Sequence, residues 1–119
     1  MAKYKNAKNL EKTIKLAHVK TGGRLLRNNV GAYQKGARWI QYGLGKGSSD
    51  LIGWTTIEIT PDMIGKKIAV FTAVELKTEK DRASKEQINF VEQVHKAGGL
   101  AGIVYNEEEY KKIFERLKK

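Results

Sequence analysis

The chain contains no cysteine, a single proline and two histidines. The lack of cysteine excludes a disulfide framework, a thiolate nucleophile and any thiolate metal or iron–sulfur site. Two histidines, His18 and His95, are too few for a multi-histidine zinc site. No apolar run reaches the ~18 residues of a membrane span, and the first residues lack the apolar stretch of a signal peptide. We therefore expect a soluble, cytoplasmic protein with no membrane contact.

Acidic residues are nearly absent from the first 47 residues. This segment holds eight lysines and three arginines but a single acid, Glu11, so it carries the whole net charge of +10. Residues 48–119 hold twelve basic and twelve acidic residues and are neutral overall. Such a positive segment attracts polyanions, of which nucleic acid is the commonest. The alternative is a solvated basic surface that only aids solubility.

The 119 residues fit one domain, residues 1–119, with one core. An apolar stripe before Gly22-Gly23 predicts a first helix over about residues 6–21. Ser84 and Gln87 form a capping-box pattern that opens a second helix, and Asn106 is the expected cap of a third. Strands are predicted over residues 24–30, 37–42, 48–59, 68–77 and 100–105. This order indicates a mixed α/β domain with a single small sheet flanked by helices.

Three polar features lie at predicted strand ends. Asp50 follows a glycine-rich loop and begins an apolar strand. Glu75 and Lys77 are two residues apart, so their side chains project to one side of the strand while Leu76 faces the other way. A carboxylate and an ammonium at this place form either a structural ion pair or part of a catalytic site, because burying them unpaired is costly. Gln87 lies ten residues further on, in the first turn of a helix.

Two carboxylates on adjacent strands can hold Mg²⁺, a hard cation that takes oxygen ligands. The expected ligands are Asp50, Glu75 and the backbone carbonyl of Leu76. Such a metal lowers the pKa of a bound water and neutralises charge that develops on a phosphate. Lys77 would orient the water or stabilise the transition state.

Four separated blocks of the chain together resemble a stand-alone VRR-NUC domain of the PD-(D/E)xK nuclease superfamily, whose small members are typically encoded by phages and prophages. The resemblance covers nearly the whole chain, from Leu10 to about Tyr110. One departure is Ser49, which stands before Asp50 where the superfamily's name has proline. The blocks that carry the resemblance are Arg27–Ala32, Tyr42–Gly53, Val74–Lys77 and Ser84–Gln87.

The resemblance assigns roles to five positions. The metal-binding aspartate of the family falls on Asp50, its E-x-K pair on Glu75 and Lys77, its glutamine on Gln87, and an acid of its first helix on Glu11. For Glu11 the alternative is a surface ion pair with a lysine four residues on. For Gln87 the capping box alone is a sufficient explanation. Candidates for phosphate contacts are Arg24, Arg27, Lys46, Ser48 and Ser49, with solvated charge as the alternative.

The family implies a Mg²⁺-dependent, structure-selective DNA endonuclease, in which Mn²⁺ is expected to substitute. It also implies a homodimer that acts on branched DNA such as a four-way (Holliday) junction, in the bacterial host cytoplasm if the chain is phage-encoded. Two symmetric nicks need two sites related by a twofold axis, and a domain this small offers one. The alternatives are a nuclease that nicks flaps or linear duplex and, from another class, a non-catalytic basic DNA-binding protein.

Overall fold

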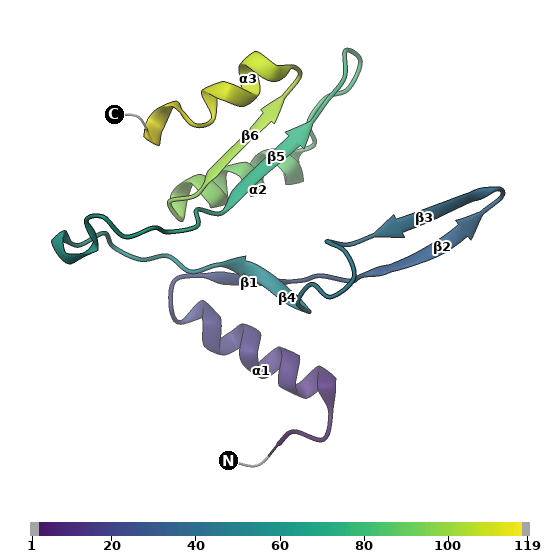
Figure 1. The fold of residues 1–119 in the computed structure, drawn as a ribbon, viewed down its shortest axis with the longest axis horizontal. Helices are drawn as coiled ribbons and strands as arrows, with labels where there is room; N and C mark the ends of the chain where they lie inside the picture. The colour runs from purple at the N-terminus through teal and green to yellow at the C-terminus, as the bar shows by residue number, and fades with distance from the viewer. Residues whose placement is uncertain (1–2, 118–119) are drawn as a thin grey trace. The chain divides into compact units, whose positions relative to one another are not determined.

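The computed structural model describes residues 3–117, which form two compact units that divide at Ile57 and Glu58 (Figure 1). The first unit contains one helix and four strands, and the second contains two parallel strands with helices between and after them. In this part of the chain no helix combines the length and the apolarity needed to span a membrane.

The first unit begins with helix α1 (Ala7–Val19), followed by the antiparallel pair β1 (Arg24–Arg27) and β4 (Leu51–Trp54). The side chain of Asn6 caps α1 by accepting a hydrogen bond from the backbone N–H of Lys8 at 2.8 Å. His18 Nε2 lies 2.8 Å from the Trp54 carbonyl oxygen and ties the end of α1 to β4. Only glycine fits at Gly53, because a Cβ there would lie 1.8 Å from the Arg24 carbonyl oxygen.

A β-hairpin extends from this pair of strands (Figure 1). It consists of β2 (Gly31–Lys35) and β3 (Arg38–Tyr42), joined by a two-residue turn. Gly36 in the turn has a φ of +62°, a backbone conformation that favours glycine. The sequence predicted β3, over residues 37–42, and β1, within residues 24–30, but no strand over residues 31–35, and so missed the hairpin.

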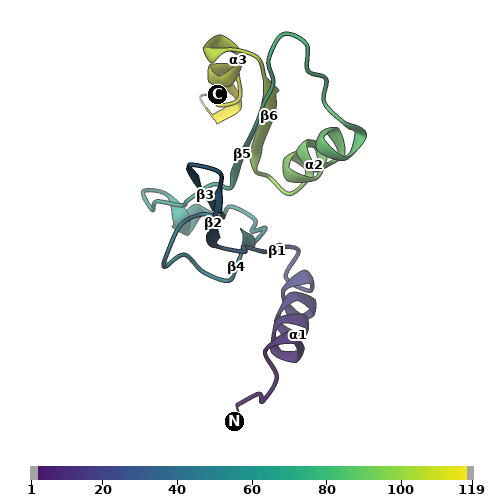
Figure 2. The same ribbon diagram turned by 90° about the vertical axis from the view of Figure 1, so that its right-hand side faces the viewer.

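The second unit is built on the parallel strands β5 (Thr72–Leu76) and β6 (Leu100–Val104), which α2 (Lys85–Lys96) connects. Helix α2 covers one face of the pair and α3 (Glu107–Lys112) the other (Figure 2). The capping box of α2 and the Asn106 cap of α3 are confirmed. Two short 3₁₀ turns complete the unit, η1 (Pro61–Met63) and η2 (Glu115–Leu117).

The buried hydrophobic side chains of residues 3–117 all belong to the second unit, where they come from α2 and β6. These two elements enclose a small core in which Val94 is 1% exposed and Leu100 2%. The apolar side chains of the first unit are only partly covered, as Leu10 at 41% and Ile14 at 42% show.

The mixed α/β class is confirmed, but the single sheet predicted from the sequence is wrong for the described residues. The strands pair in three two-stranded sheets: β1 with β4, β2 with β3, and β5 with β6. Strand β5 begins at Thr72 rather than Ile68 because its partner β6 offers only five residues to the ladder. Strand β4 is likewise limited to the four residues that β1 can pair.

Candidate active site

Glu75 and Lys77 lie side by side at the carboxyl end of β5, as their spacing predicted. Lys77 Nζ is 3.2 Å from Glu75 Oε2, and the lysine side chain is only 14% exposed. The intervening Leu76 faces the other way and is 74% exposed. A largely buried ammonium needs a partner, and Glu75 supplies it. The carboxylate is more accessible, with 35% of its side chain exposed, so a further cation can still reach it.

Gln87 lies near Glu75 across a cavity of about 480 Å³ between β5 and the start of α2. Its side-chain carbonyl accepts a hydrogen bond from the Ser84 N–H at 2.9 Å, and its own N–H donates to Ser84 Oγ at 3.1 Å. The capping role is therefore real, and the same contacts hold the glutamine beside the cavity. Its role in the site stays a prediction.

Glu86 is a candidate that sequence reasoning missed. It lines the same cavity as Glu75, from the first turn of α2. An acid in a first turn is common because it favours the helix dipole, so the sequence gave no reason to single it out. Its presence here adds a second carboxylate beside the end of β5.

The connection between β5 and α2 is itself fixed. Asp81 accepts hydrogen bonds from the hydroxyl of Thr78 at 2.7 Å and from its N–H at 3.0 Å, and these bonds hold the pKa of Asp81 below its ordinary value. The Tyr105 hydroxyl donates to the Asp81 carbonyl oxygen at 2.9 Å. These hydrogen bonds hold the turn from Thr78 to Asp81, which begins the segment between Lys77 and Gln87.

Glu11 lies between two basic residues in the first unit. Its carboxylate is 3.1 Å from Lys15 Nζ on the same helix and 2.8 Å from the Arg27 guanidinium at the end of β1. The hydrogen bond from Lys15, with the charges of Lys15 and Arg27, lowers the pKa of Glu11 against the opposing effect of desolvation. The ion pair with Lys15, proposed above as the alternative, is present. It joins a second ion pair that ties α1 to β1, and a metal role for Glu11 stays a prediction.

The lowered pKa of Glu11 predicts a pH-dependent contact between α1 and β1. Because the folded-state pKa is depressed, the contribution of this carboxylate is fully present at neutral pH. It is lost as the pH falls through the lowered pKa, below the ordinary value of about 4.3. A carboxyl-carbon NMR titration should show this midpoint, and Lys15→Ala should raise it. An unchanged midpoint in Lys15→Ala would contradict the assigned cause.

Asp50 follows a loop that one asparagine holds together. Asn28 Nδ2 donates to Ser48 Oγ at 2.8 Å and to the Ser49 carbonyl oxygen at 2.9 Å, and its Oδ1 accepts from the Leu44 N–H at 3.1 Å. Its backbone N–H also donates to the Asp50 carbonyl oxygen at 2.8 Å. The sequence placed Asn28 inside a matching block but gave it no role. The sequence feature that could have identified Asn28 is its residue type, because side-chain amides commonly bind the backbone of loops such as this glycine-rich one.

Removing the Asn28 side chain should loosen the loop that leads to Asp50. We expect Asn28→Ala to lower the cleavage rate about tenfold or more, because two or three hydrogen bonds of about 1 kcal/mol each are lost. Asn28→Asp keeps the acceptor for the Leu44 N–H, so its cleavage rate should lie between those of the wild type and Asn28→Ala. Single-turnover kinetics measure the effect, with Asn9→Ala on exposed α1 as the control. Equal rates for Asn28→Ala and Asn9→Ala would show that the loop does not position Asp50.

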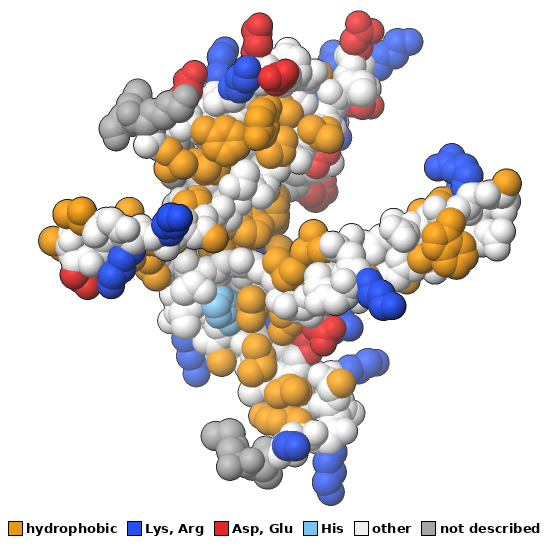
Figure 3. Space-filling view, viewed as in Figure 1, with side chains coloured by type: hydrophobic (Ala, Val, Ile, Leu, Met, Phe, Trp, Pro, Cys, Tyr) orange, Lys and Arg blue, Asp and Glu red, His pale blue; other side chains and the backbone are white. Residues whose placement is uncertain are grey.

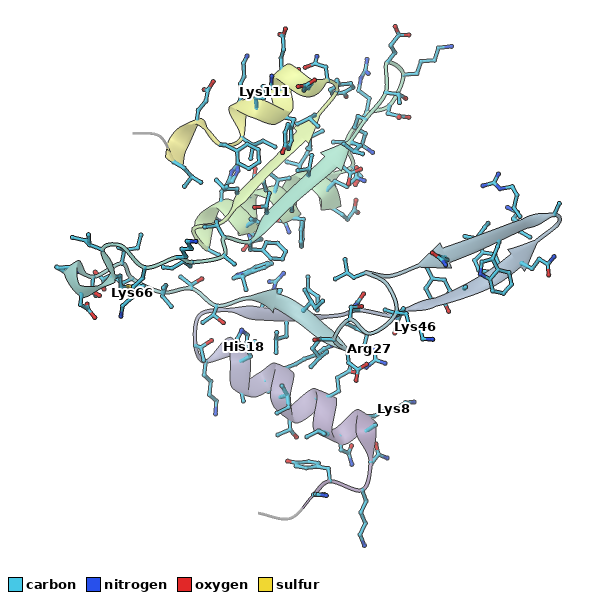
Figure 4. All side chains as sticks on the ribbon, viewed as in Figure 1. Lys8, His18, Arg27, Lys46, Lys66 and Lys111 are labelled. Carbon is cyan, nitrogen blue, oxygen red and sulfur yellow. The ribbon has the colours of Figure 1, made fainter. Side chains whose placement is uncertain are left out.

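Most candidates for phosphate contacts already have partners within the first unit. Arg24 lies 5.8 Å from the Trp54 ring centroid, and Arg27 binds Glu11 and the side chain of Asn29. Lys46 lies at the base of the hairpin, where it lines a cavity (Figure 4). The roles of Arg24, Arg27, Lys46, Ser48 and Ser49 in DNA binding stay predictions.

The donor chemistry of these residues suits a hard divalent cation. The candidate ligands Asp50, Glu75 and the Leu76 carbonyl offer only oxygen atoms, which Mg²⁺ and Mn²⁺ prefer. Asp50 belongs to the first unit and Glu75 to the second. Among residues 3–117, no group of three or more acidic or histidine side chains that could hold a metal is gathered.

Glu75 is paired with Lys77 at the end of β5, and it lines a cavity together with Gln87 of α2. This end of the strand is a candidate phosphodiesterase site. The family model of the VRR-NUC domain matches residues 6–108, which include parts of both units. The chain belongs to the VRR-NUC family, and it is a metal-dependent nuclease of the PD-(D/E)xK type. Comparison with curated proteins and with solved structures gave no match.

Proposed function

We propose that this protein is a Mg²⁺-dependent, structure-selective DNA endonuclease that acts as a homodimer on four-way junctions, with residues 1–119 as one nuclease domain. The observation that carries the proposal is the Glu75–Lys77 pair at 3.2 Å at the end of β5, with Gln87 beside the same cavity. This arrangement supports a hydrolytic site at the end of β5.

The roles follow from the chemistry of each group. Asp50, Glu75 and the Leu76 carbonyl would hold the metal, which supplies an activated water and neutralises charge on the phosphate. Lys77 Nζ orients the attacking water or stabilises the charge of the transition state. In-line attack on phosphorus breaks the bond to the 3′ oxygen of the preceding sugar, leaving a 5′-phosphate and a 3′-hydroxyl. Glu11 and Gln87 assist by positioning.

The charge distribution supports DNA as the substrate. Between Glu11 and Asp50 the chain has eight basic residues and no acidic one. Figure 3 shows basic side chains along α1 and at the outer end of the hairpin. No sequence-reading module is present in the sequence, so phosphate and shape contacts should dominate.

One argument and one observation support a homodimer. The proposed pair of symmetric nicks requires two sites. In addition, α1 leaves apolar side chains exposed, with Leu16 at 61% and Val19 at 59%. Such an apolar surface is expected where a second copy of the chain binds. Light scattering at micromolar concentration should give twice the 13.4 kDa chain mass. A monomer mass would contradict the dimer.

The deciding experiment compares an immobile four-way junction with a linear duplex of the same sequence, with and without Mg²⁺. Paired, metal-dependent nicks near the junction centre would support the whole proposal. Equal cleavage of both substrates would leave a duplex nuclease, and cutting of a flap in preference to the junction would leave a flap nuclease. DNA that is bound but uncut with Mg²⁺ and Mn²⁺ would favour the non-catalytic DNA-binding alternative.

A further inference from the structure

The β2–β3 hairpin has one face that combines tyrosines with cations. Residues paired across an antiparallel ladder project to the same side. The register therefore gathers three pairs on one side, which we name the tyrosine face: Gly31 with Tyr42, Tyr33 with Ile40, and Lys35 with Arg38. The ring centroids of the two tyrosines are 6.4 Å apart with their planes inclined at 45°, which confirms that they share this face.

Both tyrosines are open to solvent. Tyr33 is 50% exposed and Tyr42 48%. Tyr42 lies over Gly31, since a Cβ at Gly31 would be 2.2 Å from the tyrosine hydroxyl oxygen. Glycine at this position thus leaves room for the hydroxyl end of the tyrosine ring. Exposed aromatic rings held in place by backbone, rather than in a core, are suited to receive a flat ligand.

The opposite face of the hairpin differs in charge. It consists of Ala32, Gln34, Trp39 and Gln41, without a charged residue. Trp39 is 65% exposed, so it is at least as accessible as the tyrosines. The two faces therefore differ in charge. One has aromatic rings with cations, and the other has an aromatic ring without them, so the second face can serve as a control for the first.

A cavity of about 540 Å³ lies at the base of the hairpin, next to the tyrosine face. It is lined by Tyr42, Lys46, Gln41 of the opposite face and residues 30–32 and 43–45. Lys46 lies in the glycine-rich loop, four residues before Asp50 (Figure 4). Cations thus mark both ends of the face, with Lys35 and Arg38 at the tip and Lys46 at the base, and the rings lie between them.

We propose that the tyrosine face binds the unpaired bases of a branched DNA substrate, with Tyr33 and Tyr42 stacking on bases and the cations contacting phosphates. Positive charge along a path with aromatic stacking platforms is the chemistry of single-strand recognition. Each strand of five residues spans about 17 Å, long enough to follow a few nucleotides of a single strand. A second copy is a less suitable occupant, because the segment between Glu11 and Asp50 has eight basic residues and no acidic one, so two such segments repel each other. The inference rests on the proposed function in taking DNA as the substrate.

The test measures binding to a forked duplex with single-stranded arms and to a blunt duplex, by fluorescence anisotropy with Ca²⁺ in place of Mg²⁺. Tyr33→Leu should weaken binding to the fork about tenfold while changing binding to the duplex little. Tyr33→Phe keeps the ring and should bind as the wild type does. Trp39→Leu makes the same kind of change on the opposite face and should have no effect on the fork.

Several results would overturn the inference. These are an equal loss of fork binding in Trp39→Leu, an equal loss on fork and duplex in Tyr33→Leu, or no loss in Tyr33→Leu. A halved mass of Tyr33→Leu by light scattering would instead make the face a dimer contact. If Tyr33→Leu fails to fold, the double variant K35Q/R38Q at the exposed tip should weaken fork binding and reduce its salt dependence, and unchanged binding would overturn the inference.

Cleavage of the same substrates in Mg²⁺ separates this inference from the proposed function. If the protein binds the fork through Tyr33 but cuts no DNA, the nuclease proposal is refuted and the role of the tyrosine face is supported. If it cuts branched DNA equally well with and without Tyr33, only the role of the tyrosine face is refuted.

Discussion

Lys77→Met should lower the rate of DNA cleavage about a thousandfold and leave DNA binding nearly unchanged. The methionine keeps an unbranched apolar stem of similar length, so the 14% exposed position stays filled. What is lost is the ammonium group 3.2 Å from Glu75, and with it the stabilisation of charge at the reacting phosphate. Binding should persist because Lys77 is one of 23 basic residues in the chain.

Single-turnover cleavage under saturating enzyme measures the chemical step, and anisotropy measures binding. Lys77→Arg retains the charge on a different shape and should recover little activity, because a guanidinium places its donors differently from an ammonium. Lys111→Met is a matched control, since that lysine pairs with Glu107 at 3.2 Å on exposed α3. Loss of binding in Lys77→Met would contradict the catalytic role and make Lys77 a substrate contact.

Asp50→Asn should abolish metal-dependent cleavage, with a loss of about a thousandfold or more. The substitution changes the charge but hardly the shape, so the Asn28 N–H bond to the carbonyl oxygen at position 50 is retained. An amide is a poorer ligand for Mg²⁺ than a carboxylate, so metal affinity and water activation both fall. DNA binding without metal should be equal or tighter, because a negative charge that repels phosphate is removed.

Asp62→Asn makes the same chemical change at an exposed aspartate in η1 and should leave cleavage intact. Isothermal titration with Mn²⁺ gives a second measurement, in which Asp50→Asn should weaken metal binding and Asp62→Asn should not. Full cleavage by Asp50→Asn would remove Asp50 from the metal site and favour a different acid, with Glu86 beside Glu75 the first to test.

Local rules explain what the sequence predicted well. The capping patterns at Ser84 and Asn106 placed the starts of α2 and α3, because an N-cap satisfies helix N–H groups within a few residues. The two-residue spacing of Glu75 and Lys77 placed both on one side of β5, because strand side chains alternate. The motif blocks indicated the family, and the match to the VRR-NUC family model confirmed it.

The errors concern strand pairing. The hairpin was missed because its first strand, β2, is mostly polar and exposed and lacks the hydrophobic pattern of a strand. The single predicted sheet failed because strand ends depend on how many residues the partner offers, as at β5 and β6. The residues of a strand do not themselves encode which partner it pairs with.

The sequence by itself determined the basic first segment, the helix starts, the Glu-x-Lys pair and the family, since each depends on residue type and short spacing. Only the tertiary structure decided that Arg27 pairs with Glu11, that Asn28 holds the loop before Asp50, and that Glu86 joins Glu75 and Gln87 at one cavity. The physical reason is that these contacts join segments brought close by strand pairing and helix packing, which no local pattern encodes.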